Sequence, residues 1–477
     1  MHRLSGMDAM FLYNEVPTQH MHTVKLATLD VPADYSFAEA RRDFAARVHT
    51  VPPLRQRVVP TPFGLNHPLM IEDPDFDPAL HFRRAALPHP GGRAELCDFI
   101  SEVASRPLDR TGPLWELWMV EGLAGGQVAC VMKVHHALAD GVATADMLRR
   151  FLSKAPGQAP EPEDPPWQPE AVPSRGRRVW LAVRDLVPFL RSAVPALWHA
   201  VRAARRRRAE HAALVHGGHG FEAPDTSFNG LLTAQRRFSP STIAFDEIVR
   251  VKDGLGGTVN DVVLAMVSGA LRRYLLERGE LPDRSLVATV PVSTRTPEQE
   301  GTFGNHVAAL YVRLRTEVAD PLVRYRAIQQ ESAASKRDFA DAPGAQLADF
   351  LELMPPFVAR WMFSRTTTWM KRAGRPSQAN VIVSNVPGPR EELYENRFPL
   401  SAFYSIGPVL EGVGLNITAW SYRDQLHFAV LSDRKMLPDP SVVNDLLRDA
   451  LIELSKLADE ARAASRADAD GEDRDGA

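Results

Sequence analysis

The pattern of apolar and polar positions predicts strands and helices mixed along the first part of the chain. Val128–Val134 is a continuous apolar run of the kind that forms a buried strand, and His22–Ala27 predicts a second strand. Apolar residues recur at helical spacing in residues 143–152, and Phe37–Val48 and Glu95–Ser105 also read as helices. This region therefore combines both kinds of element.

A second mixed region begins near Phe228 and ends near Leu457. Its predicted helices are Val259–Leu276 and Pro321–Lys336, and its predicted strands are Leu286–Val292, His306–Leu314 and Asn380–Ser384. Residues 415–422 and 425–431 alternate apolar and polar side chains about a short turn, which indicates a hairpin. Two mixed regions predict an α/β protein of two lobes.

The segment between the two regions has a different composition. Residues 155–173 are rich in Pro and Glu, so we expect a linker without regular structure. Residues 175–208 contain ten arginines and a single acid, Asp185, interleaved with Trp180, Phe189 and Trp198. We divide the chain into an N-terminal lobe (1–154), a linker with a basic amphipathic helix (155–227), a C-terminal lobe (228–457) and an acidic tail (458–477). We expect the tail to be a fraying helix that passes into disorder.

Composition narrows the functional classes. Charged residues make up 24% and the formal net charge is -3, which gives no reason to expect nucleic acid as a partner. The two cysteines, Cys97 and Cys130, form no CxxC pair, so a disulfide framework and a thiolate zinc site are not expected. No signal peptide and no run of eighteen apolar residues is recognisable. We expect a cytoplasmic protein that is soluble or peripheral to a membrane.

Residues 135–141, His-His-Ala-Leu-Ala-Asp-Gly, directly follow the predicted strand Val128–Val134 and carry the candidate chemistry. A structural interpretation makes Asp140 the N-cap of the next helix and Gly141 the relief of a tight turn. A metal site is disfavoured, because adjacent residues at a strand end, here His135 and His136, point to opposite faces. General base catalysis is the third interpretation, since a hydroxyl needs a base within reach as it attacks. No Gly-x-Ser-x-Gly elbow is present, so direct transfer is simpler than a covalent acyl-enzyme.

At this motif the chain resembles the bacterial wax ester synthase/diacylglycerol acyltransferase family, within the superfamily of CoA-dependent acyltransferases. The motif alone indicates only the superfamily, and further segments narrow the resemblance to the family. These segments are 4–12, 107–110, 113–116, 258–262, 291–295, 304–305 and 384–389. The resemblance covers nearly the whole chain except the Pro-rich linker and the acidic tail.

The resemblance implies two chloramphenicol-acetyltransferase-like lobes with the active site in a channel between them. It implies that His136 is the base that deprotonates a diacylglycerol or long-chain alcohol, which attacks the thioester of a long-chain acyl-CoA. The expected products are triacylglycerol or a wax ester, with acyl-CoA as co-substrate and no cofactor or metal. Asp140 would make a structural ion pair, for which Arg295 is the expected partner, and His135 and Gly141 complete the motif as scaffolding.

The remaining candidate residues lie in the outer motifs. Thr258, Asn260, Ser293 and Asn385 are candidates for binding substrate, although helix capping explains the 258–262 segment equally well. Leu114 and Trp115, in the 113–116 segment, are expected to be core residues. The sequence does not identify the donor that stabilises the oxyanion.

Arginines interleaved with aromatic residues in 175–208 indicate an amphipathic surface that docks on anionic lipid, at a membrane or a lipid droplet. We therefore expect peripheral association with the inner face of the membrane, although a charge run is usually a solvated face. Two alternatives remain at this point. One is a condensing acyltransferase that uses carrier-protein thioesters, and the other is a non-catalytic lipid-binding protein.

Overall fold

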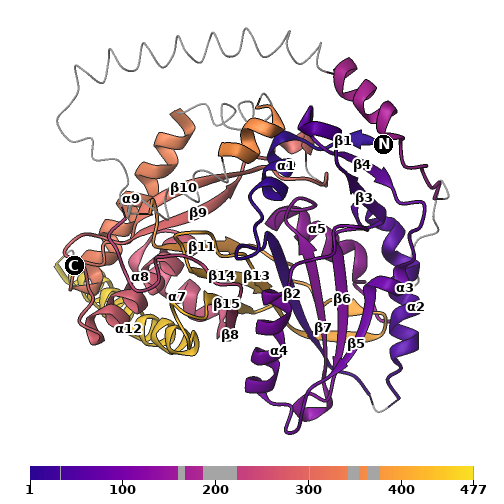
Figure 1. Cartoon of the computed structure of the whole chain (residues 1–477). Coiled ribbons are helices and arrows are strands. Elements are labelled where there is room, and N and C mark those ends of the chain that lie inside the picture. The colour runs from indigo at the N-terminus through magenta and orange to yellow at the C-terminus, as the bar shows by residue number, and fades with distance from the viewer. Residues whose placement is uncertain are drawn as a thin grey trace, which may run out of the picture.

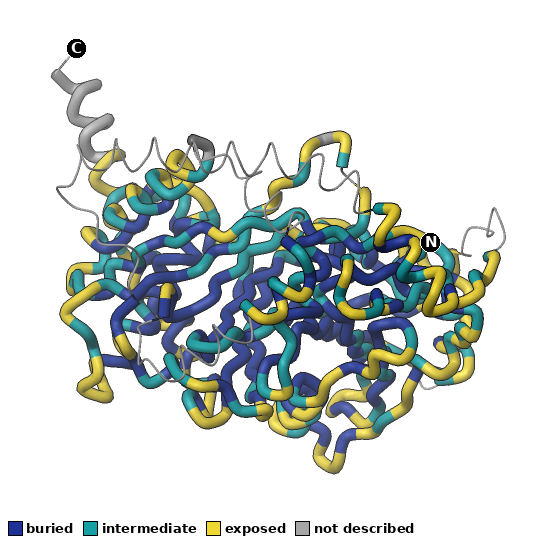
Figure 2. Tube along the Cα trace, turned by 45° about the horizontal axis from the view of Figure 1, so that its top comes forward, coloured by how far each residue is buried: buried dark blue, intermediate teal, exposed yellow. Residues whose placement is uncertain are grey.

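The computed structural model describes residues 1–32, 34–158, 167–185, 223–299, 301–341, 354–362 and 377–475. Within these residues the chain forms two six-stranded sheets and one small sheet, with helices packed on them (Figure 1). The predicted strands and helices are present close to their expected positions. Buried residues form the interior of both lobes, and the exposed residues lie mainly in the connecting loops (Figure 2).

The N-terminal sheet has the strand order β12-β13-β2-β7-β6-β5. Its strands are β2 (His22–Leu29), β5 (Phe82–Ala86), β6 (Trp115–Glu121), β7 (Val128–His135), β12 (Tyr394–Glu395) and β13 (Phe398–Ile406). Helices α2 (Phe37–Arg47) and α5 (Gly141–Phe151) cover one face, and α4 (Arg93–Ser105) covers the other. Because side chains alternate along a strand, Lys25 and Ala27 face α5 whereas Val24 and Leu26 face α4.

The C-terminal sheet has the strand order β10-β9-β11-β14-β15-β8. Its strands are β8 (Arg236–Ala244), β9 (Val287–Ser293), β10 (Val307–Arg313), β11 (Val381–Val386), β14 (Leu415–Tyr422) and β15 (Gln425–Asp433). Its helices are α7 (Phe245–Leu255), α8 (Val259–Glu277), α9 (Pro321–Asp341) and α12 (Ser441–Asp475). Helix α8 is buried along most of its length, because it contributes to the core on nearly every side.

Short elements complete the N-terminal lobe. The small sheet has the order β1-β4-β3 and consists of β1 (His2–Arg3), β3 (Gln56–Val59) and β4 (Leu69–Glu72). Helix α1 (Gly6–Tyr13) follows β1, and α3 (Pro78–His81) precedes β5. Single turns of 3-10 helix occur at Val48–Thr50, Pro52–Arg55, Pro62–Gly64, Ala124–Gly126 and Pro297–Gln299.

The two lobes share a core. Val24 and Leu26 of β2 pack in one apolar cluster with Phe238 of β8 and Leu431 of β15. Strand β13, which belongs by sequence to the second half of the chain, pairs with β2 of the N-terminal sheet. The N-terminal sheet is therefore not confined to residues 1–154, because β12 and β13 from within 228–457 complete its edge.

Helix α12 extends from the C-terminal lobe into the acidic tail. Helix α12 continues without a break from Ser441 to Asp475. Ala458 is fully buried against Gly254 of α7, which anchors the helix where the acidic region begins. Beyond this contact the sequence is rich in Ala, Asp and Arg, and Ala and Arg are strong helix formers, which favours continuation of the helix past its packed part.

The basic segment falls only partly within the described residues. Residues 175–185 form a helix, and Phe189, Trp198 and the arginines from Arg191 to Arg208 lie outside the described residues. Leu181 and Ala182 are buried, and Leu181 packs on Val59 and Ile71 of the small sheet. Leu181 is therefore a core contact rather than part of an exposed apolar face.

No single described helix is long and apolar enough to span a membrane. Helices α7 and α8 reach that length and composition only together, and they are bent by 98° at the break between them. Both contribute to the core of the C-terminal lobe.

Candidate active site

The two histidines of the motif leave the end of β7 in different directions. The ring of His135 is fully buried, its Nδ1 accepts the Ala137 N–H, and its Nε2 lies 3.4 Å from the Glu15 carboxylate. The backbone N–H of His136 donates to the Met21 carbonyl, and its half-buried ring meets the other lobe at Asn305. His135 therefore holds the turn, and His136 faces the junction of the lobes.

Asn305 determines which nitrogen of His136 carries the proton. Nδ1 of His136 lies 3.0 Å from the Asn305 side-chain oxygen. The side-chain NH₂ of Asn305 donates to Asp8 Oδ1 and to the His136 carbonyl oxygen, each at 2.7 Å. Because both amide donors are used, the atom that faces the ring is the oxygen, and Nδ1 must be the donor. Nε2 is then left with its lone pair, as a general base requires.

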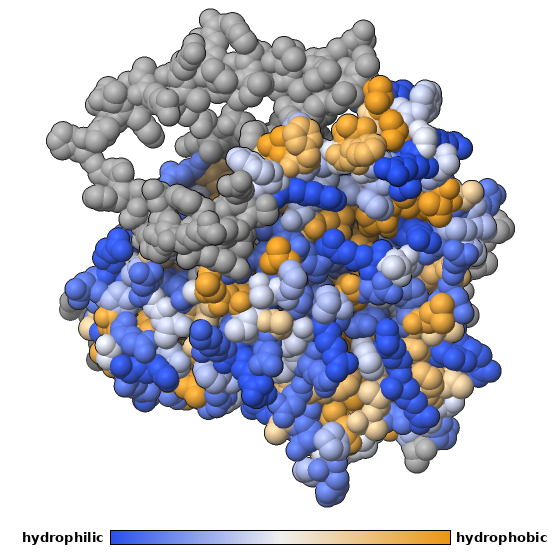
Figure 3. Space-filling view, viewed as in Figure 1, coloured by the Kyte–Doolittle hydropathy of each residue, from blue (hydrophilic) through white to orange (hydrophobic). Residues whose placement is uncertain are grey.

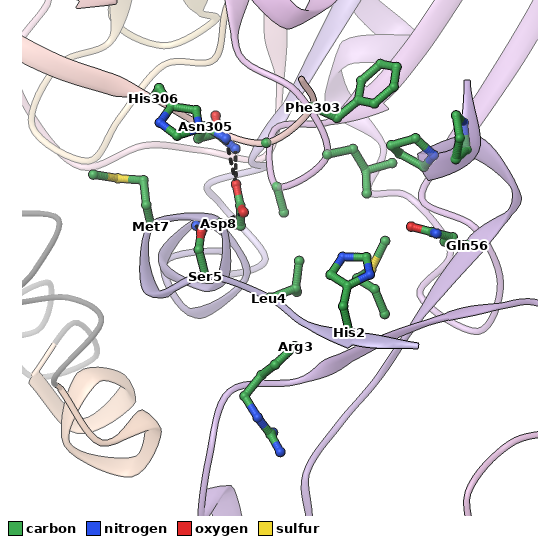
Figure 4. A pocket seen from close by; sticks show the side chains of 16 residues that line it. His2, Arg3, Leu4, Ser5, Met7, Asp8, Gln56, Phe303, Asn305 and His306 are labelled. Atoms are coloured by element: carbon green, nitrogen blue, oxygen red, sulfur yellow. Dashed lines mark hydrogen bonds between the residues drawn. The ribbon is translucent and has the colours of Figure 1, made fainter. Parts of the chain in front are cut away.

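Asp8 holds Asn305 from the N-terminal helix α1. Its Oδ1 accepts from the backbone N–H of Asn305 at 2.8 Å as well as from the amide, and its Oδ2 accepts from the Ser5 hydroxyl. Figure 4 shows Ser5 and Asp8 on one side and Asn305 and His306 on the other, joined by these hydrogen bonds. Burial raises the pKa of Asp8. Residues almost 300 positions apart thus meet beside His136.

Phe11 and Lys25 shape the environment of the His136 ring. The Phe11 ring stacks on it with a centroid distance of 4.2 Å and an interplanar angle of 11°. Burial, and then the positive charge of Lys25, lowers the pKa of His136 to about 4. The imidazole is therefore neutral near pH 7, which is the protonation state that can accept a proton.

The Asp140 carboxylate is held by groups from both lobes. Its Oδ1 accepts the Ala143 N–H at 2.8 Å as the N-cap of α5. Its Oδ2 accepts the backbone N–H of His306 at 2.9 Å and an N–H of Arg295 at 3.1 Å. The expected ion pair between Asp140 and Arg295 is present. Asp140 is also the N-cap of α5, so both interpretations of this residue hold.

Arg295 uses its planar group to join three segments. Besides Asp140, it donates to the carbonyl oxygens of Gly304 at 2.6 Å and of Thr302 at 3.2 Å. The side chains of Asp140 and Arg295 are 1% and 3% exposed, so the ion pair is shielded from solvent. Through Gly304 the pair fixes the segment before β10, which contains Asn305.

Gly141 is required for space rather than for backbone conformation. It begins α5 with an ordinary φ, and a Cβ atom placed on it would lie 3.3 Å from the Val386 side chain of β11. The expectation that it relieves a tight turn is therefore wrong, and its role is to allow close approach of the lobes.

Two cavities lie on either side of the motif at the lobe junction. One, of about 500 Å³, is lined by β1, α1, Ala137, Leu138 and residues 303–306 (Figure 4). The other, of about 330 Å³, is lined by residues 140–142 and by β9, β10 and β11. Asn260, Ser293 and Asn385 all line the second cavity, so three of the four substrate-binding candidates are brought together.

The remaining outer-motif residues are structural. Thr258 does not line either cavity, because its hydroxyl is engaged with Asp261 in a capping box at the start of α8. Leu114 and Trp115 are buried, and the Trp115 indole N–H donates to the Leu54 carbonyl, which confirms them as core residues.

Sequence reasoning missed Asn305, Asp8, Phe11 and Lys25 as site residues. Asp8 and Phe11 lie in the 4–12 segment and Asn305 in the 304–305 segment, so these short motifs were the available signal. Nothing in the linear sequence pairs these segments with each other. Lys25 carried a signal of its own, as a single cation within an otherwise uncharged strand.

The fold and this site define a class: a two-lobed acyltransferase-like protein with a neutral, oriented histidine at the lobe junction. Residues 4–263 match the family described as the wax ester synthase/diacylglycerol acyltransferase catalytic domain. Residues 303–455 match the C-terminal domain of the same family. The chain belongs to the wax ester synthase/diacylglycerol acyltransferase family.

Relatives and solved structures agree with this assignment. The Mycobacterium tuberculosis protein Rv3087, provisionally named a diacylglycerol O-acyltransferase, is 39% identical over 449 residues, which cover 91% of this chain and 92% of the relative. Rv0221 of the same organism, named in the same way, is 37% identical over 465 residues, 96% of this chain and 97% of the relative.

The wax ester synthase/diacylglycerol acyltransferase from Marinobacter aquaeolei VT8 superposes with a TM-score of 0.70 at 29% identity and covers 96% of this chain and 100% of its own. A condensation domain of the calcium-dependent antibiotic synthetase has a TM-score of 0.58 at 17% identity, over 96% of each chain, and shows the shared fold. The expected two-lobed acyltransferase fold is thereby confirmed.

Proposed function

We propose that the protein transfers a long-chain acyl group from acyl-CoA to the hydroxyl of diacylglycerol, giving triacylglycerol, and to long-chain alcohols, giving wax esters. The observation that carries the proposal is the hydrogen bond between His136 Nδ1 and Asn305, which leaves Nε2 as the proton acceptor. A general base must lie within hydrogen-bond reach of the proton that it accepts. Asn305, which holds the His136 ring, lines one of the two cavities at the lobe junction, and Asp140 lines the other.

The proposed reaction is one direct transfer. The acceptor hydroxyl gives its proton to His136 Nε2 while its oxygen forms a bond to the thioester carbonyl carbon. The carbon–sulfur bond of the resulting tetrahedral intermediate then breaks, and the imidazolium returns the proton to the departing sulfur, so that CoA leaves as a thiol. No covalent acyl-enzyme forms.

Asp140 and Arg295 act as positioning residues in this proposal. Their ion pair is buried, and neither side chain contacts the His136 ring directly. They hold residues 304–306 against the motif, and this contact sets the place of Asn305. Asn260, Ser293 and Asn385 are assigned to the polar parts of the substrates, because they line the cavity beside Gly141.

The helix of residues 175–185 is proposed to dock on an anionic membrane or lipid-droplet surface on the cytoplasmic side. Trp180 and Val183 are 59% and 53% exposed, and Phe63 beside them is 74% exposed. Arg175 lies over the Phe63 ring and Arg184 over the Trp180 ring. Hydrophobic side chains gather where this helix lies, at the top of the face in Figure 3. Exposed aromatic and apolar side chains flanked by arginines are typical of an interfacial helix.

The activity is tested by incubating the purified protein with palmitoyl-CoA and either diolein or hexadecanol. Release of the CoA thiol together with chromatographic detection of triacylglycerol or wax ester would support the proposal. No thiol release with either acceptor would contradict it, and comparison of the two acceptors decides which one the site prefers.

A further inference from the structure

The second cavity at the lobe junction, of about 330 Å³, connects the motif with helix α9 of the C-terminal lobe. Asp140 and Gly141 line it at the start of α5, and Ser332 and Lys336 line it from α9. Residues four apart lie on one face of a helix, so α9 turns a single face towards this cavity. A cavity of this volume lies in the range that holds small molecules and cofactors.

Lys336 gives this cavity a positive charge. Asp140 is the one acid among the described residues that line it, and it is held in its buried ion pair. Lys336 is exposed and has no ion pair with a carboxylate of the described residues, and Glu331, which precedes it on α9, pairs instead with Arg313 and Arg315. A cation that faces a cavity without a counter-charge attracts an anionic group of a ligand.

The wall between the motif and Lys336 carries both polar and apolar groups. Asn260, Ser293 and Asn385 line it with amide and hydroxyl side chains. Its apolar side chains include Val290, Val292, Val307, Leu310 and Val312. The pantetheine arm of CoA has the same two kinds of group, because its amides and its hydroxyl alternate with methylene groups and a dimethyl carbon. This wall therefore matches that arm in chemistry.

The distance from the motif to Lys336 also fits this arm. The backbone N–H of His306, just before β10, donates to Asp140 at 2.9 Å. The Ser335 hydroxyl of α9, which packs on β10 (Figure 1), donates to the Tyr311 carbonyl at 2.7 Å. From His306 to Tyr311 the strand covers about 17 Å at about 3.3 Å per residue. The sulfur and the first phosphorus of CoA are about thirteen bonds apart, which span about 15 Å at about 3.5 Å for every three bonds.

We propose that this cavity holds the pantetheine arm of acyl-CoA and that the Lys336 ammonium group binds the pyrophosphate at the end of that arm. Diacylglycerol and long-chain alcohols carry no charge, so the cation distinguishes the donor from the acceptor. The proposal rests on the proposed acyltransferase function and names a residue that recognises its donor substrate.

The test compares two acyl donors, palmitoyl-CoA and S-palmitoylpantetheine, which lacks the phosphates. Lys336→Met should lower kcat/KM for palmitoyl-CoA about tenfold, because the variant loses a hydrogen bond to a charged group. The loss should lie in KM rather than in kcat, since the contact is remote from the reacting atoms. The kcat/KM for S-palmitoylpantetheine should stay unchanged, and Lys336→Arg, which keeps the charge, should retain most of the activity with palmitoyl-CoA.

Arg337→Met is the matched control, because Arg337 is the next residue, is exposed and does not line the cavity. An equal loss with both donors in Lys336→Met, or the same loss in Arg337→Met as in Lys336→Met, would overturn the proposal. Faster transfer from palmitoyl-loaded acyl carrier protein than from palmitoyl-CoA would assign the phosphate to a carrier protein and would overturn it as well.

A binding measurement separates this proposal from the proposed activity. CoA and pantetheine are each titrated by calorimetry into the wild type and into Lys336→Met. We expect the Kd of CoA to rise about tenfold in the variant while the Kd of pantetheine stays the same. This result would support the site even without turnover, whereas equal CoA affinities of the two proteins would overturn the role of Lys336 and leave the acyltransferase activity untouched.

Discussion

Nδ1 of His136 lies 3.0 Å from the side-chain oxygen of Asn305, and this contact joins the two lobes at the proposed base. The amide of Asn305 cannot turn over without losing its two donor contacts, to Asp8 and to the His136 carbonyl. The tautomer of the histidine is thus fixed by a residue of the other half of the chain.

Asn305→Ala should lower kcat by about tenfold to a hundredfold with a much smaller change in KM. The ring keeps its nitrogen but loses the partner that orients it and selects its tautomer. Steady-state kinetics with palmitoyl-CoA and diolein measure both constants. Thr302→Ala is the control, because the Thr302 hydroxyl contacts only the Gln299 carbonyl. If Asn305→Ala and Thr302→Ala have the same kcat and KM, Asn305 does not orient His136 for catalysis.

Asp140→Asn should lower the free energy of unfolding by about 3–5 kcal/mol, because it leaves the buried guanidinium of Arg295 without its counter-charge. Arg295→Lys should also destabilise the protein and slow turnover, since a lysine cannot donate to Asp140, Gly304 and Thr302 together. Denaturant unfolding and activity are measured on both variants. If Asp140→Asn loses stability and rate while Arg295→Lys changes neither, the pair does not act as described.

Lys25→Met should move the acid limb of the kcat/KM profile to higher pH. Burial and the Lys25 charge together place the pKa of His136 at about 4, so removing the charge raises that pKa and leaves the contribution of burial. Ser405→Ala is the matched control, because it removes the hydrogen-bond partner of Lys25 and keeps the charge. If the acid limb of the kcat/KM profile lies at the same pH in Lys25→Met as in the wild type, the charge of Lys25 does not affect the pKa of His136.

Acidification should destabilise the fold below about pH 6.5. Burial lowers the pKa of His427 to about 4, and it also lowers the pKa values of His22 and His135. The unfolded chain then binds more protons than the folded one between the two pKa values, so the free energy of unfolding falls as pH falls through that range. For His427 alone the loss is about 3 kcal/mol.

Urea unfolding at a series of pH values measures this loss, and His427→Gln should show a shallower decline than the wild type between about pH 6.5 and pH 4. Parallel curves for the two proteins would mean that His427 does not contribute.

Deletion of residues 175–208 should reduce cosedimentation with phosphatidylglycerol liposomes at low salt. The double substitution Trp180→Ser and Val183→Ser should have the same direction of effect, because both side chains are exposed on the described helix. Leu80→Ser is the control, since Leu80 is 72% exposed on α3, away from this helix. Unchanged cosedimentation after the deletion would refute the docking surface.

Much of the fold could be predicted from periodicity, because the elements carry strong local patterns. The run before the motif is β7, and the alternating residues near the C-terminus form the β14–β15 hairpin. The placement of β13 beside β2 could not be predicted, since this pairing is set by packing between distant segments and has no local signal.

The candidate site was predictable in part for the same reason. His136, Asp140 and Arg295 stand in motifs with characteristic residue types. The family resemblance implied an ion pair for Asp140, and Arg295 was the expected partner because it follows a strand of the other lobe. Asn305 and Asp8 contribute through contacts over almost 300 residues, which a single sequence does not contain.

The most direct test of the central claim is the rate of CoA release by His136→Ala, with palmitoyl-CoA and the better of diolein or hexadecanol. We predict ester formation by the wild type and a loss of at least about a hundredfold in kcat for the variant, with an unchanged free energy of unfolding. Turnover by His136→Ala at the wild-type rate, or the same absence of CoA release from both proteins, would contradict the account.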